Sequence, residues 1–162
     1  MLGAQDKEEH LPDLVVRSLT VKDEEGRDAV KIQVQDGKRS LILFDKDGKP
    51  RARLVVLPDG MPILSFSDKD GKARAALSVL PDGAPILTLY DENGKVRAEM
   101  ALIEGGVPRL FLSDKDGKPR AGLIVSQDGS PSLDLCGKDG ENRVTLGWHP
   151  DGASGLVLCD KD

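Results

Sequence analysis

Acidic residues recur at short spacing in segments such as Asp68-Lys69-Asp70-Gly71-Lys72. Carboxylates at alternate positions begin many oxygen-ligand loops, so calcium binding is the chemistry that this pattern could support. The glycine comes too early for an EF-hand loop, a lysine separates the two acids and no bidentate glutamate follows. Asp and Gly are also the residues that a tight hairpin turn requires. We therefore expect turns here and no metal site.

An arginine follows each of these acidic segments at the same distance, in the series Arg51, Arg74, Arg97, Arg120 and Arg143. A ring of guanidinium groups could bind a polyanion, and Arg97 over Tyr90 or Arg51 over Phe44 could form cation–π pairs. The simpler expectation is that each arginine bonds the carboxylates of its own turn and keeps an outward face of the sheet hydrated.

Candidate nucleophiles and bases are few. Cys136 and Cys159 occupy the same repeat position two strands apart, roughly 10 Å, which is beyond disulfide reach, so we expect small outward-facing thiols. The two histidines, His10 and His149, lie near a chain end or a turn and give no catalytic triad or metal set. The sequence predicts no enzyme and no cofactor. A net charge of -5 and 3 % aromatic residues argue against nucleic acid as a partner.

Two series of glycines set the organisation of the chain, because each recurs every 23 residues. The first is Gly48, Gly71, Gly94, Gly117 and Gly140, and the second is Gly37, Gly60, Gly83, Gly106, Gly129 and Gly152. Two turns per unit indicate a β-hairpin repeat. Five units run from Ser40 to Ser154, a degenerate unit precedes them from Ser18, and a half unit follows.

Apolar residues within a unit alternate with a period of two, as in Leu64 and Phe66, which is typical of a strand with one buried face. If Asp70-Gly71 is a two-residue type I′ loop, Phe66 pairs with Ala75 and Leu64 with Leu77. The other turn, at Pro81-Asp82-Gly83, is expected to be a three-residue loop with a left-handed glycine. A single unit buries too little to fold, so the hairpins must share ladders.

We therefore predict an all-β fold of antiparallel β-hairpin repeats with about 13 short strands, closed into a shallow barrel or ring. Such a barrel would have a radius on the order of 13 Å, too wide for Leu, Ala and Val to fill. The expected lumen could hold an apolar small molecule or a lipid. Its predicted lining is Leu41, Leu43, Leu54, Leu64, Phe66, Leu77, Leu87, Leu89, Met100, Leu110, Leu112, Leu123, Leu133, Leu135, Leu146 and Trp148.

The seam of this ring is a difficulty, because an odd number of alternating strands would bring the first and last together in parallel. Either Leu14 to Val16 supplies an extra strand, or the open edge pairs with another chain to form a homo-oligomer. The sequence leaves both alternatives open.

The string D-x-x-G-K-x-R-A-x-L, at Asp45 to Leu54, Asp68 to Leu77 and Asp114 to Leu123, resembles the hairpin repeats of the bacterial β-flower proteins. The resemblance covers Leu19 to Asp162. It implies a shallow, nearly symmetric ring around a hydrophobic channel, comparable to Tubby-like barrels, and it implies no established activity. Gly137, Glu141 and Trp148 depart from the pattern, so the last full unit is expected to be irregular.

The domain organisation follows from these patterns. Residues 1–13 are expected to be a disordered or short extension, and 14–162 to form the repeat domain. No signal peptide or membrane span is recognisable, so a cytoplasmic location is expected. The leading functional hypothesis is a non-catalytic protein that binds a hydrophobic ligand or lipid. The alternative is a structural, oligomerisation or protein-interaction module.

Overall fold

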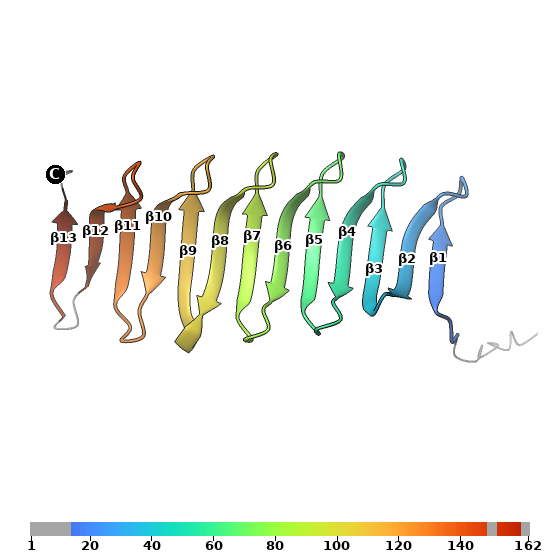
Figure 1. Cartoon of the computed structure of the whole chain (residues 1–162), viewed down its shortest axis with the longest axis horizontal. Helices are drawn as coiled ribbons and strands as arrows, with labels where there is room; N and C mark the ends of the chain where they lie inside the picture. Colours follow the sequence, from blue (N-terminus) through green and yellow to red (C-terminus); the bar gives the residue numbers. More distant parts are fainter. Residues whose placement is uncertain (1–13, 149–151, 160–162) are drawn as a thin grey trace, which may run out of the picture.

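Period-two alternation builds one continuous sheet in the computed structural model of the chain, which describes residues 14–148 and 152–159. Figure 1 shows the strands side by side in chain order, each antiparallel to its neighbours. The strands are β1 (Ser18–Lys22), β2 (Asp28–Gln35), β3 (Lys38–Phe44), β4 (Pro50–Val56), β5 (Pro62–Ser67), β6 (Ala73–Val79), β7 (Pro85–Tyr90), β8 (Val96–Ile103), β9 (Val107–Ser113), β10 (Pro119–Val125), β11 (Pro131–Cys136), β12 (Asn142–Trp148) and β13 (Ser154–Leu158).

The predicted all-β class and strand number are confirmed, and the described residues contain no α-helix. One 3-10 turn, Glu104–Gly106, joins β8 to β9, where two successive glycines replace the Asp-Gly of the other units. Both glycines have positive φ, 77° and 76°. This turn therefore uses backbone conformations that favour glycine at two positions.

The acidic turns are three-residue loops and not the predicted two-residue type I′ loops. In the turn of Asp68, the Asp68 N–H donates to the Lys72 carbonyl at 2.9 Å and the Gly71 N–H donates to the Asp68 carbonyl at 3.1 Å. Gly71 alone has a positive φ, +81°, whereas a type I′ loop needs one at both central residues. The pattern is that of a type I turn followed by a left-handed glycine. Asp36-Gly37, at 50° and 72°, is the one two-residue loop of the predicted kind among the described residues.

The turns at the other end of the hairpins match the expectation. Around Pro81-Asp82-Gly83, the Leu80 N–H donates to the Ala84 carbonyl at 2.9 Å, and Gly83 has a φ of +88°. This turn is therefore of the same type as the acidic turn of Asp68 at the other end of the strands. Prolines follow this second turn and begin β5, β7 and β11, positions at which a strand tolerates them.

The predicted register is confirmed, since Phe66 pairs with Ala75 and Leu64 pairs with Leu77. The extra loop residue does not change this result, because a β-bulge lies between Phe66 and Ser67 and absorbs the shift. All the residues predicted to line a lumen consequently lie on one face of the sheet.

The predicted closure into a ring is wrong, because β1 and β13 are the two ends of an open sheet (Figure 1). Leu14, Val15 and Val16 belong to no strand, so the extra strand considered for the seam is not formed. Thirteen alternating strands leave β1 and β13 pointing the same way, and a parallel pair would have to close the ring. The thirteen described strands enclose no lumen, and their leucines face an open surface.

Substitution of Gly71 tests the turn geometry. A Cβ at Gly71 would meet no atom within 4 Å, so Gly71→Ala changes only the cost of the left-handed conformation. We expect a loss of about 1 kcal/mol in the free energy of unfolding, measured by urea denaturation. Gly71→Asn should lose less, because Asn tolerates positive φ. A Gly71→Ala chain as stable as the parent would contradict this turn.

Candidate functional site: an exposed apolar face

The most unusual surface of the molecule is one complete face of the sheet, which we call the apolar face. Its central row takes one residue from every strand, and each member pairs directly with the next. In strand order the row is Leu19, Ile32, Leu41, Leu54, Leu64, Leu77, Leu87, Met100, Leu110, Leu123, Leu133, Leu146 and Leu156. No charged or polar side chain interrupts it.

A second row on the apolar face runs beside the first, two residues nearer the acidic turns. Here large residues alternate with small ones over much of the sheet, as in Phe66, Ala75, Leu89, Ala98 and Leu112. The alternation leaves room between neighbouring large side chains. On the other side of the central row lie further apolar pairs, among them Val79 with Pro85 and Val125 with Pro131.

These side chains are open to solvent although they are apolar. Leu77 and Leu123 are each 49 % exposed, Met100 is 54 % and Trp148 is 62 %. Ala101, 6 % exposed, is the one buried hydrophobic residue among the residues described. A single-layer sheet has nothing stacked on it, so the leucines that would form a core in a two-layer domain form a surface here.

Shallow hollows lie on the part of the apolar face formed by β6 to β13. One of about 320 Å³ lies between Leu77, Leu87, Met100 and Pro108. Another, of about 310 Å³, is lined by Leu123, Leu133, Leu146 and Trp148. Apolar side chains and prolines form most of these walls, so each hollow fits a protruding apolar side chain.

The opposite face, which we call the mixed face, carries polar groups, and some of them pair within the sheet. Arg109 donates to Glu99 at 2.7 Å, and the Thr145 hydroxyl donates to Asp134 at 2.6 Å. The Arg109 guanidinium also lies over the Phe111 ring, 5.3 Å from its centroid. Thr88 on this face is only 6 % exposed. The mixed face thus has internal contacts that the apolar face lacks.

Close packing on the mixed face explains one glycine that no turn requires. A Cβ at Gly122 would come within 2.7 Å of the Phe111 ring, which lies directly across the ladder from it. Glycine at this position therefore makes room for the aromatic ring. The sequence alone marks Gly122 only as a residue inside a strand.

The first aspartate of each acidic turn organises that turn. One Asp68 carboxylate oxygen accepts hydrogen bonds from the backbone N–H groups of Asp70 and Lys72, at 2.9 and 3.0 Å. The other accepts from Arg74 Nε at 2.9 Å. Asp45, Asp91 and Asp114 repeat the two backbone bonds. These carboxylates act within the protein as turn caps, which fits the expectation of turns in place of metal loops.

The arginine series bonds its own turns, as expected. Arg74 and Arg120 donate through Nε to Asp68 and Asp114, at 2.9 and 2.8 Å. Arg51 lies 3.4 Å from Asp45. The cation–π pairs that the sequence could also allow, Arg51 with Phe44 and Arg97 with Tyr90, are not found in the described part of the chain, where Arg109 and Phe111 form such a pair.

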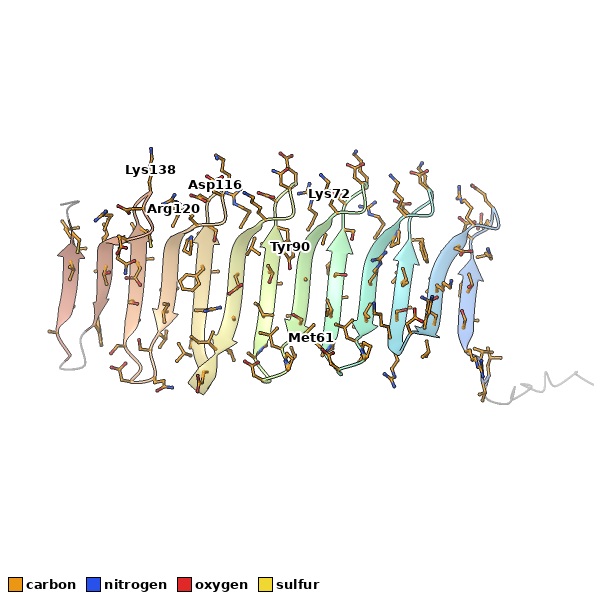
Figure 2. All side chains as sticks on the ribbon, in the orientation of Figure 1. Met61, Lys72, Tyr90, Asp116, Arg120 and Lys138 are labelled. Carbon is orange, nitrogen blue, oxygen red and sulfur yellow. The ribbon has the colours of Figure 1, made fainter. Side chains whose placement is uncertain are left out.

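Long cationic side chains also link each acidic turn to the next hairpin. Arg51 Nε donates to the Ser67 carbonyl at 3.0 Å, and Arg97 Nε donates to Ser113 at 2.9 Å. Lys72 Nζ reaches the Glu92 carbonyl at 2.8 Å. Figure 2 shows Lys72, Asp116 and Lys138 along this one end of the strands, with Met61 at the other. These bonds tie successive units together at one end of the sheet.

The last acidic turn keeps its backbone geometry although Gly137 replaces the capping aspartate. The Gly137 N–H donates to the Glu141 carbonyl at 2.8 Å. Asp139 takes over the side-chain role, because its carboxylate accepts from the Glu141 N–H at 3.2 Å and pairs with Arg143. The predicted irregularity of this unit is thus a change of side-chain contacts.

The caps change the acidity of their carboxyl groups. At Asp45 the hydrogen bond from the Lys49 N–H is the main cause that lowers the pKa below its ordinary 3.8. At Asp114 partial burial acts to raise the pKa, but bonds from the Lys118 N–H and the Arg120 guanidinium outweigh it and lower the pKa to about 2. Both carboxyl groups are therefore charged near neutral pH.

The remaining candidate residues do not converge on a site. Cys136 and Cys159 are free thiols, and Cys136 Sγ donates to Asn142 at 3.2 Å. His10, His149 and residues 1–13 lie outside the described residues. No group of three His, Cys, Asp or Glu side chains placed to hold a metal is found in residues 14–148 and 152–159. Over the same ranges no helix is long and apolar enough to cross a membrane.

Comparison with known proteins gives only distant similarity. Neither the family models nor the curated proteins give a match. Among solved structures, the TCP10 domain of Danio rerio CPAP carrying E1021V is 18 % identical, with a TM-score of 0.40 over 87 % of this chain and 78 % of that chain. The wild-type domain is 17 % identical, with a TM-score of 0.33 and the same coverage. The SAS-4 TCP domain of Drosophila melanogaster, in complex with a proline-rich motif of Ana2, is 10 % identical, with a TM-score of 0.37 over 92 % and 99 %. The resemblance to β-flower proteins stays a prediction.

Acid unfolding tests the capping carboxylates. Because the pKa of Asp114 is lowered on folding, its stabilising effect is complete above about pH 3.8 and is lost as pH falls toward about 2. Asp114→Asn keeps an oxygen acceptor but removes the charge that Arg120 contacts. We expect the variant to be less stable than the parent at pH 7 and the difference to shrink between pH 4 and pH 2, measured by urea denaturation at each pH. Asp116→Asn, in the same turn, is the matched control, and an unchanged difference across this range would contradict the assignment.

Proposed function

We propose that the protein is a non-catalytic structural module that self-associates by packing its apolar face against the apolar face of a second copy. The observation that carries this proposal is the contrast between the two faces. Two polar pairs lie within the mixed face, Arg109 with Glu99 and Thr145 with Asp134, whereas the apolar face presents an unbroken row of aliphatic side chains, most of them exposed to solvent.

The size of the apolar face fits a second copy. Thirteen strands spaced about 4.8 Å apart span roughly 62 Å, and about five residues of strand cover roughly 17 Å, giving a face of about 1,000 Å². Stable interfaces bury about 800 Å² on each partner, and the largest apolar patch of an ordinary monomer is about 300 to 600 Å². The apolar face is therefore too large for an isolated monomer and large enough for a dimer.

The shape of the apolar face also favours packing against the same face of a second copy. Two sheets pack face to face about 10 Å apart, with side chains of one filling gaps of the other. The hollows beside Met100 and Leu123 lie between exposed apolar side chains of the same face. A small apolar ligand would fill one hollow and leave the rest of the face in water. A second copy covers the whole length at once.

The experiment is small-angle X-ray scattering over a range of protein concentrations. A single-layer sheet is about 10 Å thick and two packed sheets are about 20 Å thick. We expect the thicker particle for the parent chain. The double variant Leu77→Lys with Leu123→Lys places charges on the central row and should return the particle to one layer, because burying an unpaired charge is costly.

The matched control is Ser78→Lys with Ser132→Lys, which adds the same charge to the mixed face and should keep two layers. Native mass spectrometry of the parent chain tests whether an apolar small molecule or a lipid occupies the apolar face instead of a second copy. A one-layer particle at every concentration that carries an apolar small molecule or lipid would overturn the proposal in favour of ligand binding. A two-layer particle that survives the Leu77→Lys, Leu123→Lys changes would also overturn it.

A further inference from the structure

The two edges of the open sheet differ in how they are protected. The strand β1 ends in Lys22, which forms an ion pair with Asp28, and Arg17 precedes it. Charged residues at a sheet edge discourage pairing with another chain. The strand β13 is Ser-Gly-Leu-Val-Leu, with no charge and no proline, and Leu158 is 70 % exposed. In the sequence, charged residues follow only after Cys159. The strand β13 itself therefore carries no feature that discourages pairing with another chain.

The register shows which backbone groups β13 presents. The Cys159 N–H donates to the Arg143 carbonyl at 2.9 Å, and Val144 pairs with Leu158. In an antiparallel ladder, hydrogen-bonded pairs alternate with pairs that are not bonded to each other. Val157 and Gly155 therefore bond to β12, while Ser154, Leu156 and Leu158 direct their N–H and C=O groups away from β12.

We propose that the β13 edge pairs with the β13 edge of a second copy, antiparallel, about a two-fold axis that passes midway between the two Leu156 residues. This register brings Leu156 opposite Leu156 of the second copy, and Ser154 opposite Leu158. Every residue brought together is one whose backbone groups point outward, so the pairing forms three hydrogen-bonded pairs. The axis is perpendicular to the sheet, so the apolar faces of both copies stay on the same side.

A head-to-tail arrangement fits the edges less well. The strands β1 and β13 point the same way, because both are odd members of an alternating series. Placing β1 of one copy beside β13 of another would make a parallel pair in a sheet whose ladders are otherwise antiparallel. The two-fold pairing uses the same edge on both copies, so it ends at a dimer and forms no filament.

This edge contact is independent of the proposed face packing, because it uses backbone groups of β13 and none of the central leucines outside Leu156. An experiment can therefore disprove the edge contact without disproving the face packing, and the reverse. Edge pairing lengthens a one-layer sheet, whereas face packing thickens it. The test is therefore made in the chain with Leu77→Lys and Leu123→Lys, which removes face packing from the result.

The decisive variant in that chain is Leu156→Pro. Proline removes the Leu156 N–H, which points outward, and leaves the bonds of β13 to β12 in place. We expect the dimer measured by analytical ultracentrifugation to weaken by about tenfold or more, since two donors are lost per dimer. Thr20→Pro is the matched control, because the pairing of Leu19 with Ile32 and the bond from the Val34 N–H to the Arg17 carbonyl place the Thr20 N–H on the outward side of β1. It should leave the dimer unchanged.

A second measurement keeps the proposal testable if Leu156→Pro disturbs β13. With Cys136→Ser and Cys159→Ser in place, Leu156→Cys should form a disulfide-linked dimer on mild oxidation, because residues in a hydrogen-bonded pair have Cα atoms about 5.5 Å apart. Thr20→Cys should not. Equal cross-linking of both variants, loss of the dimer in Thr20→Pro, or a chain that is monomeric before any edge substitution would overturn the proposal.

Discussion

Register is the constraint on which the rest of this structure depends. Successive side chains of a strand point to opposite faces, so a slip of one residue would send every leucine to the mixed face. The acidic turns hold the register, because a capping aspartate such as Asp68 fixes the loop backbone and an arginine such as Arg74 fixes the carboxylate. The bulge that follows each turn keeps Leu64 opposite Leu77. Turn chemistry thereby decides that one face is apolar along its whole length.

The two faces differ in the contacts that their side chains can make within one sheet. On the mixed face, Glu99 and Arg109 pair, Phe111 packs against Gly122, and Thr88 is buried without a second layer. Leucine and methionine side chains gain stability by leaving water, and in a one-layer sheet they contact only their neighbours in the same row, so much of their surface stays exposed. The proposed self-association is the consequence of this imbalance, and the open edge at β13 adds a second, separate way to meet another copy.

Much of the fold could be predicted from the sequence because it depends on local patterns. Period-two alternation and paired turn glycines predict thirteen strands, their order and the pairing of Phe66 with Ala75. Closure could not be predicted in this way, because it depends on where β1 and β13 meet in space, and no residue pattern encodes that distance. The same holds for the I′ loops, since Asp-Gly serves both a two-residue loop and a type I turn with a left-handed glycine.

The sequence predicted which leucines share one face of the sheet, but it did not predict that this face is open to solvent. The leucines share one face as expected, but that face is open and lines no channel. The bonds from each arginine to its own turn were expected, but the backbone N–H bonds by which Asp45, Asp68, Asp91 and Asp114 cap their turns were not.

Isotope-filtered NMR on a mixture of labelled and unlabelled copies tests most directly whether the sheet is open and whether two copies pack through their apolar faces. The account predicts methyl contacts between copies at Leu77 and Leu123, and none within one copy between Leu19 and Leu156. Contacts between Leu19 and Leu156 of the same copy would contradict it, because the sheet would then be closed.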